Sequence, residues 1–465
     1  CGGTVPLARQ TWLCKKKGRY VALRPDAETN RARPPGEKTV RYEVVEAKTA
    51  RGLGFNPSSG SRGGNVPCPF CGTVADSDYV KAEGQAGRIG VQPMVVVCTH
   101  PEDTGKIYLA VDEVPLTVWP DDSVVWQRIR QLELDASGHS GGALTVPDEP
   151  LPSDGGLGFR VQPYGVRSWS QYFTPRQLLG LLVLVKQVRN AHSEMLRCGY
   201  TEEQAKATST YMGLLSSRTA DWNSGMTHWT PQGEKLGPTF TRMALPMVWD
   251  FVEIDPLVKV SGNAPEAMAR MAMAVRSFAE TGPVVGKVSR GSAAALPFEA
   301  DTFDSVVTDP PYYDNVGYSD LSDFFYVWLK RSIGFLYPEH FSAFLAPKKQ
   351  EAIMDAGRHE GGGKAARNFY EQMMAGTFAE AGRVLKPNAP LVIVYAHKTT
   401  LGWATLVDAL REAGFTVTEA WPLDTERPGR PRSFDSAALA SSIFLVARRR
   451  EGDETGSYER EVRPD

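Results

Sequence analysis

From about Pro283 onward the sequence alternates between short apolar runs and longer helical stretches, and this alternation restricts the fold more than any other feature. The apolar runs predict strands at 284–288, 305–308, 391–395, 415–420 and 443–446. Helical stretches lie between most of them, for example at 369–385 and 403–413. Such alternation is typical of an α/β protein with a largely parallel, doubly wound sheet. We therefore expect residues 281–450 to form one α/β domain.

The first part of the chain has a different pattern. Residues 1–137 contain short β-prone runs between turns rich in Gly, Pro and Arg, which predicts a small β region with strands at 20–23, 40–45, 95–97 and 107–111. Residues 138–280 begin with a linker-like stretch and then turn helical. Thr174-Pro175 and Thr201 are predicted helix N-caps. The highly charged residues 451–465 are expected to be a disordered tail.

Composition favours a folded protein with two or three domains. The 465 residues are 42% apolar and 23% charged, and no apolar stretch approaches the roughly 20 residues of a membrane span. The net charge of -2 gives no global basic signature, so any nucleic-acid contact must come from local clusters such as 15–19 (Lys-Lys-Lys-Gly-Arg). For that cluster, a solvated loop or strand edge is the favoured interpretation. Six cysteines are too few for a disulfide scaffold, which favours a reducing compartment and the cytoplasm.

Cys68-Pro69-Phe70-Cys71-Gly72 has the spacing of a zinc knuckle, with two thiolates for one tetrahedral metal. Cys1-Gly2-Gly3 matches the end of the same pattern, so we predict a structural zinc ribbon that uses Cys1, Cys68 and Cys71. A chain that begins with cysteine also fits a processed lipoprotein, but we favour a sequence that is truncated at its N-terminus. Cys14 is an alternative ligand, and Cys98 with His100 is a weaker alternative pair.

The sequence Asp309-Pro310-Pro311-Tyr312 directly follows an apolar predicted strand. Ligand chemistry in open α/β sheets lies beyond the carboxyl ends of strands, so this position favours a catalytic loop over a rigid turn. The Asp309 carboxylate and the Pro310 carbonyl can accept hydrogen bonds from the amino group of a nucleobase. The Tyr312 ring, and that of Tyr313, can stack on an extruded base. His397-Lys398 is read either as part of that pocket or as a surface pair.

Several longer segments carry a family resemblance. They are 309–331 (DPPYYDNVGYSDLSDFFYVWLKR), 394–403 (VYAHKTTLGW), 438–443 (ALASSI), 173–179 (FTPRQLL) and 244–256 (ALPMVWDFVEIDP). Together they span most of the chain, which resembles the zinc-ribbon-containing adenine-specific DNA methylase family of bacteria and archaea. The resemblance implies a Rossmann-like methyltransferase fold, S-adenosylmethionine as methyl donor, and DNA as substrate. Residues 281–450 then correspond to the catalytic half, and residues 138–280 to the candidate region for target recognition.

One departure from the family concerns the donor site. Members have a glycine-rich loop of the Phe-x-Gly-x-Gly kind upstream of the zinc ribbon, and this chain has no convincing copy. We therefore expect an incomplete methyltransferase sheet, an N-terminally truncated member, or a partner segment or subunit that carries the loop. Ser292 and Ala293 precede the catalytic strand, where the donor's adenine commonly binds, but Ser292 occupies a position where Asp is frequent.

The leading interpretation is thus an enzyme that methylates adenine N6 in DNA. Cytosine N4 methylation by the same loop stays open, although an aspartate at position 309 favours adenine. A non-catalytic zinc-ribbon subunit that binds nucleic acid within a split enzyme is the alternative from another class.

Overall fold

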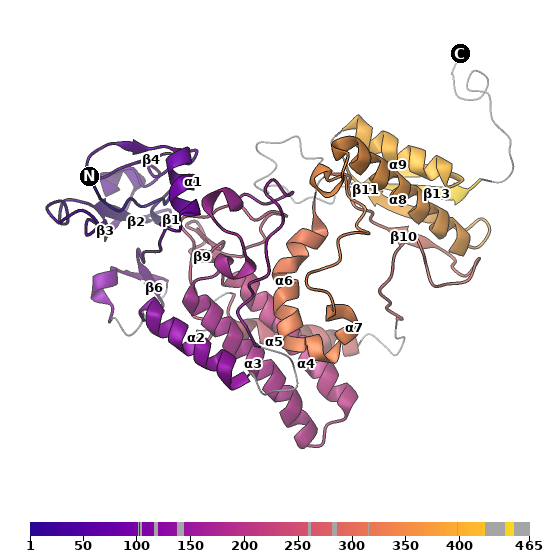
Figure 1. Ribbon diagram of the computed structural model, residues 1–465, viewed down its shortest axis with the longest axis horizontal. Coiled ribbons are helices and arrows are strands. Elements are labelled where there is room, and N and C mark those ends of the chain that lie inside the picture. Colours follow the sequence, from indigo (N-terminus) through magenta and orange to yellow (C-terminus); the bar gives the residue numbers. More distant parts are fainter. Residues whose placement is uncertain are drawn as a thin grey trace, which may run out of the picture. The chain divides into compact units, whose positions relative to one another are not determined.

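The computed structural model describes residues 1–100, 102, 105–115, 120–136, 144–258, 262–280, 286–314, 316–397, 399–423 and 442–450. These residues form two compact units (Figure 1). Unit 1 contains Cys1–Pro283 and Ser319–Ala346, and unit 2 contains Val284–Tyr318 and Pro347–Asp465. The chain therefore leaves unit 2 after the Asp309 loop, contributes a helical segment to unit 1, and returns. The four domains expected from the sequence stay a prediction.

Small antiparallel sheets make up the first part of unit 1. The largest has the order β1-β2-β3, formed by β1 (Trp12–Lys16), β2 (Arg19–Asp26) and β3 (Arg41–Ala47). Apolar side chains of β1 and β2, including Leu13 and Val21, pack with Tyr108 in its core. Three two-stranded sheets follow: β4 (Val66–Pro67) with β5 (Val74–Ala75), β6 (Val96–Cys98) with β7 (Ile107–Leu109), and β8 (His228–Thr230) with β9 (Lys235–Gly237). The strands predicted at 20–23, 40–45, 95–97 and 107–111 are confirmed as β2, β3, β6 and β7, whereas β1, β4, β5, β8 and β9 were not predicted.

Helices form the rest of unit 1 (Figure 1). They are α1 (Ser77–Gln85), α2 (Asp122–Ala136), α3 (Pro175–Arg197), α4 (Glu202–Trp222), α5 (Ala264–Ala279), α6 (Tyr318–Ile333) and α7 (Pro338–Phe341). Thr174 and Thr201 cap α3 and α4 by accepting hydrogen bonds from backbone amides in the first turn, which confirms both predicted N-caps. Within the described residues, every helix is too short or too polar to traverse a lipid bilayer.

Aromatic side chains join α6 to the start of α3. Phe324 of α6 stacks on Phe173 with ring centroids 5.5 Å apart, and Trp328 meets Phe173 edge-on at 5.4 Å. Phe324 and Trp328 are fully buried. Because aromatic pairs contribute about 0.5–1.5 kcal/mol beyond area burial, this contact explains why α6 belongs to unit 1 although it follows the Asp309 loop directly.

Unit 2 is a four-stranded sheet with a layer of two helices. The sheet order is β10-β11-β13-β12, and the strands are β10 (Val306–Thr308), β11 (Leu391–Tyr395), β12 (Phe415–Leu423) and β13 (Ser442–Arg449). The helices are α8 (Gly362–Val384) and α9 (Thr400–Glu412), which Figure 1 shows beside the sheet. Alternate residues of β11, at 391, 393 and 395, are buried in one core with apolar side chains of both helices. The described part of unit 2 thus has both helices on one face.

The structure corrects two expectations about this sheet. It is mixed rather than largely parallel, because only β10 and β11 run parallel and β13 lies antiparallel between β11 and β12. Adjacent antiparallel strands need no crossover helix, so β12 and β13 break the α/β alternation. The strand predicted at 284–288 is wrong for residues 286–288, where Val288 is 96% exposed and has no neighbouring strand. Residues 284–285 and 451–465 lie outside the described residues.

Candidate functional site

The Asp309 loop lies at the carboxyl end of the parallel strand pair. In the register of β10 and β11, Thr308 is opposite Ile393, so Asp309 leaves the sheet beside the last residues of β11. His397 follows β11 by two residues. The carboxyl ends of two neighbouring parallel strands therefore meet at one edge, which is where open α/β sheets place ligands.

The Asp309 carboxylate is exposed, and one of its oxygens is held by the loop itself. The Tyr312 hydroxyl donates a 2.6 Å hydrogen bond to Asp309 Oδ1. The Tyr312 ring meets the Tyr395 ring edge-on, with centroids 5.2 Å apart. Partial burial and the bond to Asp309 raise the pKa of Tyr312, so its hydroxyl stays a neutral donor. The loop thus presents an open carboxylate next to a half-buried aromatic ring.

The backbone of the loop adopts an unusual conformation just after the two prolines. Tyr313 has a φ of 49°, in the left-handed region that few non-glycine residues adopt. Pro310 and Tyr313 are buried while Pro311 and Tyr312 are half-buried. Residues held in such sparsely populated regions cost about 1–3 kcal/mol and cluster at functional sites. Glu234, Asp301 and Asn388 also have a positive φ, so the choice between a catalytic loop and a rigid turn stays a prediction.

His397 belongs to the interior behind the loop. Only 6% of it is exposed, its ring lies parallel to that of Tyr395, and the Thr399 amide donates a 3.1 Å hydrogen bond to its Nδ1. Its Nε2 lies 3.9 Å from a carboxylate oxygen of Asp314. The interpretation of a surface pair is therefore wrong for His397, and Lys398 lies outside the described residues.

Ser292 and Ala293, the residues expected at the donor site, lie on a segment that is anchored to α8. Arg383 donates to the Leu296 carbonyl at 3.0 Å, and Glu380 accepts from the Leu296 amide at 2.9 Å. The hydrogen bond from Arg383 lowers the pKa of Glu380 to about 2. The Ser292 hydroxyl accepts a hydrogen bond from a backbone amide of its own segment. Among the described residues, no hydrogen bond or ion pair joins Ser292 or Ala293 to Asp309.

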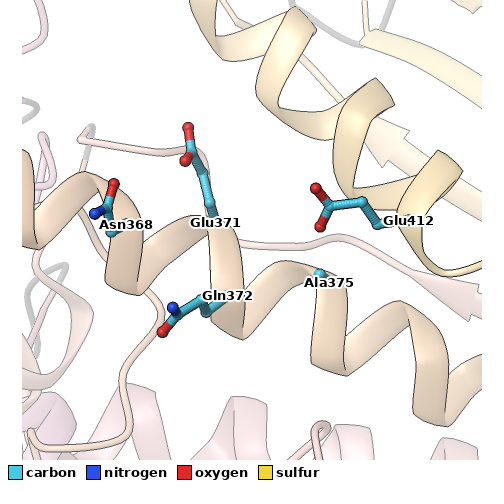
Figure 2. A pocket seen from close by; sticks show the side chains of 5 residues that line it. All are labelled: Asn368, Glu371, Gln372, Ala375 and Glu412. Carbon is cyan, nitrogen blue, oxygen red and sulfur yellow. The ribbon is translucent and has the colours of Figure 1, made fainter.

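A separate depression of about 330 Å³ lies between α8 and α9 (Figure 2). It is lined by Asn368, Glu371, Gln372, Ala375 and Glu412. Glu371 also accepts a 2.8 Å hydrogen bond from Arg367. None of the lining residues belongs to the Asp309 loop, and the two carboxylates of Glu371 and Glu412 would repel a phosphate. We therefore do not include this depression in the site.

The three cysteines predicted to bind zinc come together in unit 1, although 67 residues separate Cys1 from Cys68. The Sγ atoms of Cys1, Cys68 and Cys71 all lie within 4.8 Å of one another, and those of Cys1 and Cys68 are 3.6 Å apart. Two thiolates on one tetrahedral zinc are about 3.8 Å apart when the Zn–S distance is about 2.3 Å. Gly72, with a φ of 77°, closes the knuckle. The Phe70 ring packs so closely on Gly3 that a side chain at Gly3 would clash with it.

The cysteine cluster has the chemistry of a metal site. A hydrogen bond with the Thr73 side chain lowers the pKa of Cys71 to about 7, which favours the thiolate that binds zinc. Cys14, the alternative ligand, is buried in the core of the β1-β2-β3 sheet and bonds the Arg19 carbonyl. Within the described residues, neither Cys14 nor the pair Cys98 and His100 joins a group of three potential ligands. The residues present therefore fit zinc with three ligands.

Replacing Cys68 with serine should remove this metal site. We expect purified protein to bind zinc, and Cys68→Ser to weaken the affinity at least tenfold because a buried thiolate ligand is lost. Zinc per chain, measured by mass spectrometry and by competition with a chromophoric chelator, checks the result. Cys198→Ser is the matched control, because Cys198 is an exposed free thiol outside the cluster. Equal zinc binding by Cys68→Ser and the wild-type chain would contradict the assignment.

Two of the four cations in the basic cluster at 15–19 are paired with carboxylates. Lys16 pairs with the buried carboxylate of Glu234, and Arg19 lies 3.4 Å from the same carboxylate. Lys15 lies over the Trp12 ring, with Nζ 4.3 Å from the centroid. These contacts favour a structural role for the cluster over a free patch for phosphates.

Comparisons with known proteins give limited matches. No protein-family model matches the sequence, and no curated protein matches it. A similar solved structure is TTHA0409 from Thermus thermophilus, described as a "Putative DNA Modification Methylase". The two sequences are 16% identical over the match, which covers 36% of this chain and 56% of that chain and has a TM-score of 0.19. Another is the cyclase SpnF, which is 14% identical in sequence. That match covers 40% of this chain and 64% of that chain and has a TM-score of 0.20. The matched part covers less than two thirds of either protein, so we infer function from this chain's own residues.

Proposed function

We propose that this protein is an S-adenosylmethionine-dependent DNA methyltransferase that acts on an exocyclic amino group, most plausibly adenine N6. One observation carries the proposal: an exposed aspartate and a half-buried tyrosine leave the carboxyl end of a parallel strand together, separated only by two prolines.

The loop has the groups that this reaction needs. An exocyclic amino nitrogen is a poor nucleophile because its lone pair is delocalised into the base. The Asp309 carboxylate and the Pro310 carbonyl can accept the two amino hydrogens and direct the lone pair outward. Two prolines provide no backbone N–H that would compete for these acceptors. When bound, S-adenosylmethionine supplies a methyl group on a sulfonium sulfur.

The bond changes are simple. With the donor bound, the base nitrogen would gain the methyl group, the sulfur would leave as a thioether, and the nitrogen would have to release one proton. Asp309 holds the amino hydrogens throughout and can pass that proton to solvent, because its carboxylate is exposed. Tyr312 must release Asp309 Oδ1 when the amino group arrives, so substrate binding exchanges one hydrogen bond for another.

The donor side of the site is less complete than the base side. Ser292 and Ala293 are proposed to border the donor's adenine, but the Ser292 hydroxyl already accepts a backbone hydrogen bond. We further propose that a partner segment or subunit with a glycine-rich loop completes the donor site. β10 is the edge strand of the described sheet, and Val307 is 68% exposed. Val307 lies between the two residues of β10 that bond β11, so its amide and carbonyl face the open edge and can pair with another strand.

The zinc knuckle and the helices of unit 1 are the proposed contribution to DNA recognition, with residues 138–280 as the region that selects the target. Cys1, Cys68 and Cys71 would hold a structural Zn²⁺. The cytoplasm is the proposed location, since all six thiols are free. A zinc-ribbon subunit without catalytic activity is the second candidate, and the incomplete donor side favours it.

The test is methyl transfer from isotope-labelled S-adenosylmethionine to unmethylated DNA. After digestion to nucleosides, mass spectrometry should detect N6-methyladenine. N4-methylcytosine would move the assignment to the alternative base. Activity only after addition of the product of a neighbouring gene would support a split enzyme, and DNA binding with no transfer under either condition would support the non-catalytic subunit.

Two substitutions of Tyr312 distinguish the contribution of its ring to methyl transfer from that of its hydroxyl. Tyr312→Phe keeps the ring and loses only the bond to Asp309, which substrate binding breaks in any case, so we expect methyl transfer to change less than about fivefold. Tyr312→Ala removes the stacking surface, which is worth about 1–3 kcal/mol per base, or roughly 5- to 150-fold. Steady-state rates with labelled donor check both values. Equal losses in the two variants would show that the hydroxyl, and not the ring, matters.

A further inference from the structure

A buried tyrosine on α8 holds the backbone of the Asp309 loop. Tyr370 is 1% exposed, and its hydroxyl donates a 2.7 Å hydrogen bond to the Pro311 carbonyl. The same hydroxyl accepts a hydrogen bond from the Tyr313 amide at 3.3 Å. One side-chain oxygen therefore bridges the residues on both sides of Tyr312. Burial raises the pKa of Tyr370, so the hydroxyl keeps the proton that it donates.

The loop depends on such outside partners. Its two prolines have no amide hydrogens, and Tyr313 is in the left-handed region, so local backbone bonds contribute little. Within the loop, the Tyr313 amide approaches the Pro311 carbonyl at 3.2 Å. The Met354 amide donates to the Tyr313 carbonyl at 3.1 Å. Tyr370 and Met354 thus hold the Tyr313 peptide from both sides.

Tyr370 itself is well fixed. Its ring meets the Tyr313 ring edge-on with centroids 5.2 Å apart, and it belongs to the same buried core as Met374 and Phe378 of α8 and Leu391 of β11. A side chain locked by packing can set the direction of the groups it bonds. The core of unit 2 is therefore connected, through the backbone of Pro311 and Tyr313, to the loop that carries the Asp309 carboxylate.

We propose that Tyr370 is a positioning residue for methyl transfer: its hydroxyl fixes the turn that directs the Pro310 carbonyl and the Asp309 carboxylate at the amino group. The inference rests on the proposed function. Tyr370 is buried and does not touch the substrate, and it acts through Pro311 and Tyr313.

The test variant is Tyr370→Phe, which keeps the ring and deletes both hydrogen bonds. Tyr326→Phe is the matched control, since Tyr326 is also buried and its hydroxyl donates to the Ala343 carbonyl, which lies in unit 1. Amide hydrogen exchange of a peptide covering 309–318 reads the loop directly and needs no activity. Loss of about one net hydrogen bond should accelerate exchange there about fivefold in Tyr370→Phe and leave it unchanged in Tyr326→Phe.

Steady-state kinetics provide the second measurement. Small misplacements of reacting groups cost up to about 100-fold in rate, so we expect kcat of Tyr370→Phe to fall about 10- to 100-fold while KM for DNA changes less than about threefold. Tyr326→Phe should keep wild-type kcat. A purely structural role for Tyr370 would lower the amount of active enzyme and the melting temperature without changing kcat per folded molecule.

The two proposals fail in different ways. If the wild-type chain, with or without a partner, transfers no methyl group, the proposed function is wrong, while the exchange data still decide whether Tyr370 holds the loop. If exchange at 309–318 is the same in Tyr370→Phe and wild type, or if kcat is unchanged despite faster exchange, the positioning role is overturned although methyl transfer stands.

Discussion

Replacing Asp309 with alanine should lower methyl transfer about 100- to 10,000-fold, the range for loss of one positioned acid–base or electrostatic group. The bonds from the amino hydrogens to the carboxylate strengthen as the nitrogen is attacked and becomes positive, so the loss should appear in kcat more than in KM. DNA binding should stay within about twofold of wild type, because Asp309 is an exposed anion that cannot attract phosphates. Labelled methyl transfer and filter binding measure the two quantities.

Asp304 is the matched control for this change. It is an exposed aspartate just before β10, and it accepts a 2.7 Å hydrogen bond from Lys386 instead of pointing into the loop. Asp304→Ala should keep full activity, and both variants should unfold within about 1 kcal/mol of wild type because neither side chain is buried. Methylation by Asp309→Ala at the wild-type rate would remove Asp309 from the mechanism.

Local signals predicted the individual elements of the fold well. Helices α3 and α4 begin at the expected residues, directly after Thr174 and Thr201. Such helix starts can be predicted because the capping side chain and the first turn lie within four residues of each other. Strands β10, β11 and β13 also lie within two or three residues of the predicted runs. Each of these features depends on neighbours in sequence, which a pattern can report.

Pairing between distant segments was harder to predict. The strand predicted at 284–288 ends in Gly286-Lys287-Val288, which has no partner strand in the described chain, and Val288 is exposed. The insertion of β13 between β11 and β12 depends on how Leu445 and Ala447 pack in the core, not on their own propensity. β-propensity describes a fit to a half-buried surface, so it cannot select the neighbouring strand.

The same limit applies to the candidate site. A carboxylate and prolines after an apolar strand, and a Cys-x-x-Cys pair, are readable because the chemistry lies in consecutive residues. The structure brings Cys1 to Cys68 across the chain as expected, whereas the contact of Tyr370 with Pro311 had no signal. Tyr370 lies on one face of a long helix with ordinary apolar spacing, and only the three-dimensional structure reveals that its hydroxyl reaches the loop.

Arg331 has a structural role, although it lies in the same segment, 309–331, as the Asp309 loop. It ends the segment 309–331, which begins with the Asp309 loop, yet it lies in unit 1, buried and paired with Glu149. Its two terminal nitrogens contact the two Glu149 oxygens at 2.8 and 3.0 Å, and its Nε donates to the Thr145 carbonyl at 2.7 Å. The arginine therefore fixes residues 145–149 against α6.

Arg331→Ala should destabilise unit 1 by about 3–5 kcal/mol, because it leaves the Glu149 carboxylate buried, at 3% exposure, without its partner. Urea denaturation followed by tryptophan fluorescence reports this unit, which contains most of the tryptophans, including Trp169 and Trp328. Arg197→Ala is the control: that arginine pairs with Glu194 on the surface of α3, and its loss should cost less than about 1 kcal/mol.

Replacing both Arg331 and Glu149 tests whether the loss of stability comes from an unpaired buried charge or from lost packing. In Arg331→Met combined with Glu149→Leu, no ion is left without a partner, so most of the stability should return. Carbonyls at 145 and 146 lose a donor in either variant and should prevent full recovery. If the double variant were as unstable as Arg331→Ala, the contribution of Arg331 would come from these carbonyls and from side-chain packing instead of from Glu149.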